Sequence, residues 1–82
     1  MYIDIRSKSK YDYSHIDNAI NIDFYELYFF YDNYLNKTTK YYIYCDNGNR
    51  SRILVNRLNK KGFNCVNIDG GFNNYLKKRY NI

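Results

Sequence analysis

One cysteine stands where its neighbours favour chemistry, at the end of an apolar run and the start of a polar loop: Cys45-Asp46-Asn47-Gly48-Asn49-Arg50-Ser51. In a tight loop between a strand and a helix, backbone N–H groups turn inward and the positive end of the helix points at the same spot. Both effects lower the pKa of a central cysteine below that of a free thiol. Arg50 adds a permanent cation that can hold an anionic substrate. The alternative is a buried strand-end cysteine beside a surface arginine, and a lone Cys-x4-Arg match would leave that alternative ahead.

The segments on either side of this loop are expected to position the cysteine. Residues 41–44 form a short aromatic and β-branched run, typical of a strand buried on both faces. From Arg50 to Lys61 the apolar residues recur at helical spacing, and Gly62 follows the last turn. Gly48 can take a positive φ in the connecting loop at little steric cost. The chain therefore predicts a strand, a tight loop and a helix around Cys45.

The match extends well beyond the loop, and the sequence resembles the rhodanese-like (single-domain sulfurtransferase) family. The family's loop pattern, Cys-x-x-Gly-x-Arg-Ser, stands at residues 45–51, and its strand ending in Asp-Val-Arg is similar to Ile3-Asp4-Ile5-Arg6. Its Gly-His-Ile-Pro-Gly-Ala-Ile-Asn-Ile segment is similar to residues 15–22. Its Gly-Phe…Gly-Gly segment is similar to Lys61-Gly62-Phe63 followed by Asp69-Gly70-Gly71. Four blocks in the right order cover almost the whole chain.

The alternation of strands and helices predicts a single α/β domain over residues 1–82, a small parallel sheet with helices on both faces. Its active loop would lie at the carboxyl end of a strand, the usual place for sites in such sheets. The expected strands are Tyr2–Arg6, Ala19–Ile22, Tyr41–Cys45 and Cys65–Ile68. Helices are expected after a cap at Asp23 (with Phe24, Leu27, Tyr28, Tyr31 and Leu35 at helical spacing), over Arg50–Lys61, and after Gly70-Gly71. Residues 7–14 are expected to be loop or one helical turn.

Two departures from the family pattern have consequences. Family members usually carry a strand and a helix before the block matched by Ile3–Arg6, where this sequence begins. We therefore expect about four strands and an open edge at Cys65–Ile68, covered by dimerisation, by a tail or by nothing. In the loop, Asp46 stands where close relatives often have a neutral or basic residue. A carboxylate pointing inward would raise the pKa of the thiol and repel thiosulfate, whereas one pointing outward would do little.

The resemblance implies a sulfurtransferase that works through a persulfide on Cys45, with Asp46–Ser51 as the substrate-binding loop. The thiolate would take a sulfur atom from thiosulfate or a persulfide and pass it to a thiol or a cyanide-like acceptor. Cys-dependent phosphatases of similar fold use a longer Cys-x5-Arg loop, so phosphatase or arsenate reductase chemistry is less favoured. The alternative from another class is a weakly active or inactive rhodanese-like module that binds a protein partner; a homodimer also stays open.

Four other residues have both a structural and a functional interpretation. Cys65 is expected to pack in the core, with a resolving disulfide to Cys45 as the less favoured alternative. His15 matches a family position where histidine is commonly structural, so packing is preferred over a role as a base. Asp4 and Arg6 share one face of a strand and are expected to form a clamp rather than to contact substrate. Two cysteines and one histidine contain no metal-ligand pair, so neither a metal nor another cofactor is expected.

Charge and hydropathy limit the remaining function classes. The formal charge is +5, but the lysines are dispersed or stand at predicted helix ends, so no nucleic-acid partner is expected. No apolar run approaches the ~20 residues of a membrane-spanning helix, and the start of the sequence does not look like a signal segment. These features predict a cytoplasmic protein without membrane association. The aromatic run Tyr28–Tyr31 is expected to pack on the sheet, or else to form a patch for a partner.

Overall fold

The computed structural model describes residues 1–80, so the last two residues of the expected domain lie outside the described residues. The elements follow one another as β1 (Tyr2–Asp4), α1 (Lys8–Tyr13), β2 (Ile20–Asn21), α2 (Phe24–Phe30), the 3₁₀ helix η1 (Tyr31–Asn33), β3 (Lys40–Tyr44), α3 (Asn49–Lys60), β4 (Asn64–Asn67) and α4 (Gly71–Tyr80). The four strands form one parallel sheet in the order β2-β1-β3-β4. The predicted α/β fold with a four-stranded parallel sheet is confirmed.

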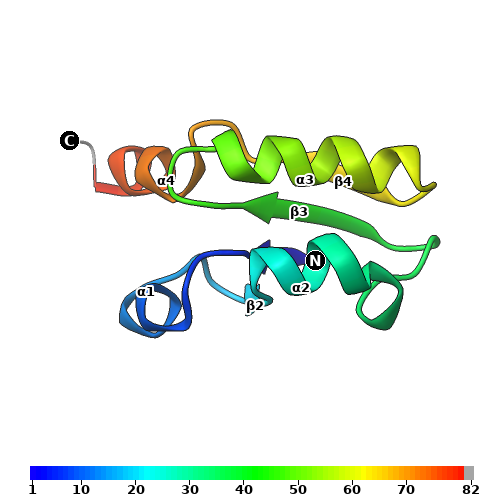
Figure 1. The fold of residues 1–82 in the computed structure, drawn as a ribbon. Helices are drawn as coiled ribbons and strands as arrows, with labels where there is room; N and C mark the ends of the chain where they lie inside the picture. The colour runs from blue at the N-terminus through cyan, green and yellow to red at the C-terminus, as the bar shows by residue number, and fades with distance from the viewer. Residues whose placement is uncertain (81–82) are drawn as a thin grey trace.

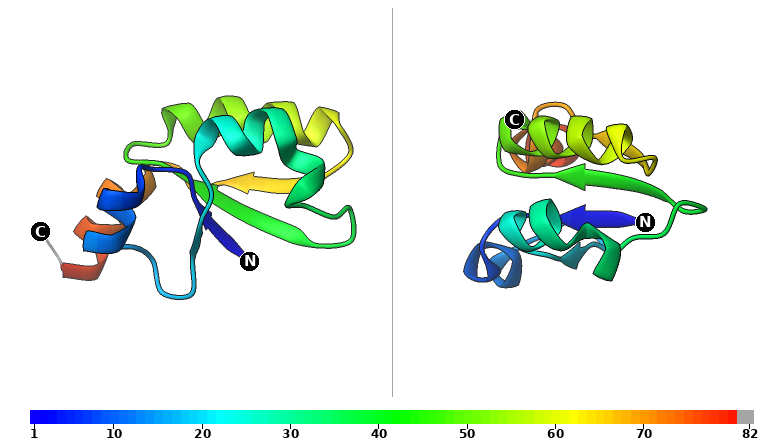
Figure 2. Two further views of the ribbon diagram at one scale, coloured as in Figure 1. Left: turned by 60° about the horizontal axis from the view of Figure 1, so that its bottom comes forward. Right: turned by 45° about the vertical axis from the view of Figure 1, so that its right-hand side comes forward.

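Helices lie on both faces of the sheet, but they cover it unequally. α2 and α3 lie side by side over one face (Figure 2). α1 and α4 lie beyond the carboxyl end of β3, at the end of the molecule where the Cys45 loop begins (Figure 1). Their side chains join Tyr44, the last residue of β3, in a small apolar cluster on the other face. The parallel order thus brings the carboxyl ends of the strands to the end of the molecule where α1 and α4 lie.

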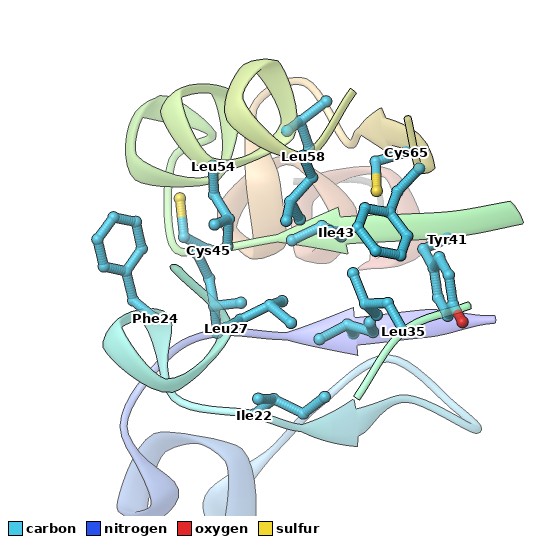
Figure 3. Close-up of a cluster of buried hydrophobic side chains, with 14 residues drawn as sticks. Ile22, Phe24, Leu27, Leu35, Tyr41, Ile43, Cys45, Leu54, Leu58 and Cys65 are labelled. Carbon is cyan, nitrogen blue, oxygen red and sulfur yellow. The ribbon is translucent and has the colours of Figure 1, made fainter. Parts of the chain in front are cut away.

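The main core fills the space between the sheet and the α2–α3 layer. Fourteen buried side chains contribute to it, drawn from alternate strand residues and from the inner sides of the two helices (Figure 3). Leu27 of α2 and Leu54 and Leu58 of α3 are fully buried there, as their helical spacing requires. Cys45 and Cys65 lie toward opposite ends of this core (Figure 3). The loop cysteine is therefore anchored on an apolar base that fixes its position.

The opposite face of the sheet stays partly open away from the strands' carboxyl ends. Tyr2, Tyr42 and Val66 stand in one register row across three strands. Tyr2 and Val66 are 38% and 37% exposed, and the rings of Tyr2 and Tyr42 stack with their centroids 5.2 Å apart. In the described part of the chain β4 pairs with β3 alone, which agrees with the open edge expected beside it.

Local contacts explain how several elements stand against the expectations. Of the two alternatives for residues 7–14, loop or one helical turn, the structure has a short helix over Lys8–Tyr13, because Ser7 caps its first turn by accepting from the N–H of Lys10. β2 has only two residues, although the N–H of Ile22 still donates to the carbonyl of Asp4; beside it the side chain of Asn21 donates to the carbonyls of Asp4 and Arg6. The helix capped by Asp23 changes to a 3₁₀ turn after Phe30.

The boundaries of β3, α3 and β4 lie within one residue of the expected ones, whereas β1 ends at Asp4, two residues before the expected end at Arg6. None of the helices within residues 1–80 combines the length and the apolar character that crossing a membrane requires.

Candidate active site

The loop that follows β3 reverses direction within a few residues and leads directly into α3. Gly48 makes the reversal with φ +91°, a conformation that side chains rarely adopt, and its carbonyl starts the helix. A Cβ at this position would also lie only 3.0 Å from the backbone nitrogen of Gly70. Asn47 shapes the same turn by accepting a hydrogen bond from the N–H of Asn49, the first residue of α3. The Asn47 side chain thus shapes the loop from the outside, and Asn49 contributes its backbone N–H.

The sulfur of Cys45 receives hydrogen bonds from the helix that the loop opens. The N–H of Gly48 lies 3.2 Å and the N–H of Ser51 3.4 Å from Sγ. The Ser51 hydroxyl, fully buried, lies 3.3 Å from the same sulfur. Cys45 itself is only 6% exposed. The structure therefore brings three residues of the predicted loop together: Cys45, Gly48 and Ser51.

Two opposing influences set the pKa of the Cys45 thiol. Burial is the largest single influence and raises the pKa, because a charged sulfur loses solvation. Hydrogen bonds from Ser51, first its hydroxyl and then its N–H, and from the N–H groups of Gly48 and Asn47 favour the thiolate. Together they outweigh burial, so the pKa of Cys45 falls below its ordinary value. The site thus favours a nucleophilic thiolate.

Asn67, at the end of β4, is a contributor that sequence reasoning missed. The Ser51 hydroxyl has one proton, which can be donated to the side-chain oxygen of Asn67 or to the sulfur of Cys45, and the amide nitrogen of Asn67 donates to the carbonyl of Gly48 at 3.1 Å. A single asparagine thus holds both the loop glycine and the serine that faces the sulfur. Its position within the strand expected over Cys65–Ile68 gave no local sign of this contact, which spans sixteen residues of sequence.

The turn before α4 fastens the loop from the other side. The N–H groups of Phe72 and Asn73 donate to the carbonyls of Cys45 and Asp46 at 2.9 and 3.0 Å. This close approach depends on Gly71, where a Cβ would lie 2.5 Å from the Cys45 carbonyl oxygen. The Gly-Gly pair that the resemblance singled out therefore has a physical role beside the sulfur: it lets the start of α4 contact the loop backbone.

An open hollow of about 310 Å³ gives access to Cys45. Its rim includes Arg50, whose guanidinium lies 4.3 Å from the ring centre of Phe24 and 5.3 Å from that of Tyr25. Arg50 makes no ion pair with any carboxylate among residues 1–80. The predicted cation of the loop therefore stands at the entrance rather than against the sulfur, with its charge available to an anion.

Asp46 points to the rim of the hollow and is neutralised there. Its carboxylate accepts a 2.7 Å hydrogen bond from Nζ of Lys10, on α1, and lies 3.9 Å from Nη1 of Arg6. Sequence reasoning left its orientation open and did not identify Lys10 as part of the site. The pairing limits the repulsion that Asp46 would exert on an approaching anion, but it also weakens the attraction of Lys10 for that anion.

The predicted clamp between Asp4 and Arg6 is present. Arg6 reaches the fully buried Asp4 carboxylate through Nε and through Nη2 at 2.7 Å, and also donates to the carbonyl of Ser14. Its guanidinium lies 4.1 Å from the ring centre of Phe72. His15 stacks on Tyr11 with centroids 3.8 Å apart and hydrogen bonds to its carbonyl, which agrees with the preferred packing role.

Cys65 is packed in the main core, and burial raises the pKa of its thiol to about 11. The strand register places it opposite Tyr41, four residues before Cys45. At about 3.3 Å per strand residue the two cysteines are roughly 13 Å apart along the strands. A disulfide needs Cα atoms within about 7 Å, so this geometry opposes the resolving role and favours packing.

Within residues 1–80, no three His, Cys, Asp or Glu side chains are grouped so that they could hold a metal ion. The groups that surround Cys45 are backbone N–H donors, a hydroxyl and cations at the rim. Such a site can stabilise a sulfur anion and admit an anionic or polarisable sulfur compound.

Comparison with known proteins shows the family. The family model of the rhodanese-like domain matches residues 1–78, and the chain belongs to this family. It is 34% identical over 74 residues to a probable molybdopterin-synthase adenylyltransferase of Porphyra purpurea, a match covering 89% of this chain and 19% of that protein. It is 32% identical over 77 residues to the adenylyltransferase and sulfurtransferase uba4 of Ogataea parapolymorpha, covering 93% and 20%. The chain spans about a fifth of the length of these curated relatives.

Solved structures of rhodanese-like proteins have a similar fold. A crystal structure of a rhodanese-related protein from Thermoplasma volcanium superposes with a TM-score of 0.86 at 31% identity, covering 94% of this chain and 76% of that one. A rhodanese-like domain protein from Staphylococcus aureus gives a TM-score of 0.73 at 33% identity, covering 85% and 68%. Family membership supports sulfur transfer as the general class of chemistry.

Proposed function

We propose that this chain is a sulfurtransferase that carries a sulfane sulfur atom on Cys45 as a persulfide. The observation that supports this most directly is the ring of hydrogen bonds from Gly48 and Ser51 to a buried sulfur whose pKa is lowered. The Cys45–Arg50 spacing is one residue shorter than in phosphatases of similar fold, whose longer loop can surround a phosphate. The shorter loop here has the size to enclose one additional sulfur atom on Cys45.

In the first step the Cys45 thiolate attacks the outer sulfur of a donor such as thiosulfate or a persulfide. The bond between Sγ and that sulfur forms, the sulfur–sulfur bond of the donor breaks, and sulfite or a thiolate leaves with the electron pair. Arg50 at the rim attracts the anionic donor. The product is a persulfide on Cys45.

In the second step a nucleophilic acceptor, a thiolate or cyanide, attacks the outer sulfur. The bond to Sγ breaks, and Cys45 leaves as a thiolate that the N–H groups of Gly48 and Ser51 stabilise. Because those donors are fixed by the start of α3, they require no rearrangement during the step. Ser51 also holds the loop through Asn67.

The acceptor is proposed to be a thiol-bearing molecule or a protein partner. The name of the Ogataea relative joins an adenylyltransferase with a sulfurtransferase, which supports a protein partner for sulfur transfer but names none for this chain. A reducing compartment such as the cytoplasm is part of the proposal, since both cysteines are free thiols.

The test is intact-protein mass spectrometry of the reduced chain before and after incubation with thiosulfate or a small persulfide. We expect a gain of one sulfur, about 32 Da, mapped to Cys45 and removed by cyanide or a thiol. The variant Cys45→Ser should keep the fold, because serine is nearly isosteric, and lose the adduct. The matched control Cys65→Ala should retain it.

Transfer activity retained by Cys45→Ser would refute the mechanism. If folded and reduced wild-type protein forms no adduct with any donor, the chain is better explained as a rhodanese-like binding module. Circular dichroism on each variant separates loss of chemistry from loss of fold.

A further inference from the structure

A second hollow adjoins the Cys45 pocket on the side of α1 and α4. It is an open groove of about 440 Å³, bounded by Tyr13 of α1 and by Phe72 and Leu76 of α4. Figure 1 shows both helices beyond the carboxyl end of β3, at the end of the molecule that carries the Cys45 loop. The groove has the size of many small-molecule sites, and its walls are mainly apolar with a few polar groups.

Three side chains line both the groove and the Cys45 pocket: Arg6, Lys10 and Asp46. The two hollows therefore adjoin at these residues. The ion pair between Lys10 Nζ and Asp46 Oδ2, at 2.7 Å, stands at their common border. A molecule with its sulfur end at Cys45 and a body a few atoms long reaches the groove by passing this pair.

The charges at the border favour a body without charge of its own. Arg6 is held by the buried carboxylate of Asp4 and is only 8% exposed, and Lys10 is paired with Asp46. Neither cation is left with its full charge for an anionic group in the groove. Beyond the border, the Tyr13 ring is 93% exposed and offers an apolar surface that lacks a packing partner within the described chain.

We propose that this groove is a second subsite, which takes the organic body of an organosulfur substrate while its terminal sulfur lies at Cys45. The proposal rests on the proposed sulfur transfer. The ligand class is a small thiol, persulfide or thiosulfonate whose body is apolar and about the size of an aromatic ring. Inorganic thiosulfate fills only the Cys45 pocket.

The test uses two donors that differ only in their body, benzenethiosulfonate and methanethiosulfonate. Both are monoanions, and both react in the same way: the Cys45 thiolate forms a bond to the terminal sulfur, the sulfur–sulfonyl bond breaks, and a sulfinate leaves with the electron pair. The ratio of kcat/KM for the phenyl and methyl donors, with cyanide as acceptor, measures what the body contributes. Because the two donors share their charge and their reaction mechanism, these factors cancel in the ratio.

The variant Tyr13→Ala removes one wall of the groove without touching the core, since the side chain is almost fully exposed and makes no hydrogen bond in the described structure. We expect the phenyl-to-methyl ratio to fall about five- to tenfold, the effect of losing part of an apolar contact for one ring. Ser9→Trp, which fills the groove from its rim, should lower the same ratio. The matched control is Tyr80→Ala, an exposed tyrosine of α4 that does not line the groove.

A binding measurement distinguishes failure of this proposal from failure of the proposed function. In Cys45→Ser labelled with ¹⁵N, benzenethiosulfonate should shift the amide resonances of Tyr13, Asn73 and Leu76, and methanethiosulfonate should shift them less. If Cys45 forms a persulfide but the ratio is unchanged in Tyr13→Ala and no groove amide shifts, the subsite is refuted and sulfur transfer stands. If no donor forms a persulfide, the sulfur-transfer mechanism fails, and absent amide shifts would refute the groove as well.

Discussion

The two cysteines of this chain are almost equally buried, yet their thiols are driven in opposite directions. Cys45 is 6% exposed and Cys65 5% exposed. The pKa of Cys45 is lowered, whereas burial raises that of Cys65 to about 11. The difference lies in the backbone nearby. Cys45 ends a strand where a helix begins and receives N–H donors, whereas Cys65 lies within β4, whose N–H groups pair with other strands and side chains.

The comparison shows that burial alone does not determine the reactivity of a cysteine in this fold. At Cys45 the hydrogen bonds are supplied by Gly48 and Ser51, which are fixed by the start of α3. They outweigh the cost of removing a charge from water.

The strongest contrast should appear in alkylation of the native protein with iodoacetamide at pH 7. With a pKa of about 11, roughly one Cys65 thiol in 10⁴ is ionised at this pH, and its burial slows access further. The lowered pKa of Cys45 means that its thiolate forms at a lower pH than that of an ordinary cysteine. We expect Cys45 to react at least about 100-fold faster, as measured by peptide mapping over time. Equal alkylation rates of Cys45 and Cys65 in folded protein would show that the two thiols do not differ in reactivity.

One glycine near each cysteine allows a matched test of how the backbone supports the two regions. In Gly71→Ala the new Cβ would lie 2.5 Å from the Cys45 carbonyl oxygen, a backbone atom that cannot move cheaply. In Gly62→Ala, just before β4, it would meet the flexible end of Lys37 at 3.4 Å. We expect Gly71→Ala to lower the free energy of unfolding by about 3 kcal/mol and Gly62→Ala by about 1–2 kcal/mol, the latter mainly from its positive φ.

Urea denaturation of both glycine variants measures these free energies. Persulfide formation should be impaired in Gly71→Ala even under conditions where the protein is folded, since the loop carbonyls must shift. Gly62→Ala should keep it. Similar stability loss and full activity in both variants would show that the Gly71 contact does not shape the Cys45 loop.

Removal of the Ser51 hydroxyl should move Cys45 toward the behaviour of Cys65. In Ser51→Ala the thiolate loses one hydrogen bond while burial stays, so the pKa of Cys45 rises. The pH at which alkylation is half-maximal should therefore increase, and the rate of persulfide formation at pH 7 should fall about tenfold. Thr38→Ala, which removes an exposed hydroxyl that lines neither hollow, is the control. An unchanged pH profile would mean that the backbone N–H groups alone set the thiolate.

The smallest effect is expected from Asp46→Asn, which sharpens the role of charge at the rim. The substitution releases Lys10 from its ion pair, so the cation can attract a dianionic donor. We expect the KM for thiosulfate to fall about threefold, and less at high salt because the charges are exposed. Asp12→Asn removes an equal charge from the ion pair with Lys8 on the same helix. A similar change in both variants would assign the effect to net charge rather than to Lys10.

Much of the site's identity is local in the sequence and could be predicted from it. The strand that ends at Tyr44, the positive φ of Gly48 and the helix that carries Ser51 all follow from short-range propensities and spacing. These features place N–H donors around Cys45 whatever else packs nearby. The parallel sheet and the cap at Asp23 were predictable for the same reason.

Other local features were left open by the sequence, or differ from the expectation, because weak signals competed. Residues 8–13 lack a buried apolar stripe, so their helix gave no periodic signal and depends on the Ser7 cap. The aromatic run after Leu27 has strong helical spacing, but the helix changes geometry after Phe30. Phe29 and Phe30 remain more than half exposed, so the choice between surplus surface and a partner patch is still a prediction.

The residues around the loop were decided only by the tertiary structure. Lys10 reaches Asp46 across 36 residues of sequence, and Asn67 reaches Ser51 across sixteen. Such pairs depend on how the strands order themselves and how α1 and α4 come to one end of the sheet, which no local pattern encodes. The sequence by itself determined that Cys45 is surrounded by hydrogen-bond donors, because those donors are its own neighbours. Folding decided which charges and which groove stand beside it, because those side chains come from elements far along the chain.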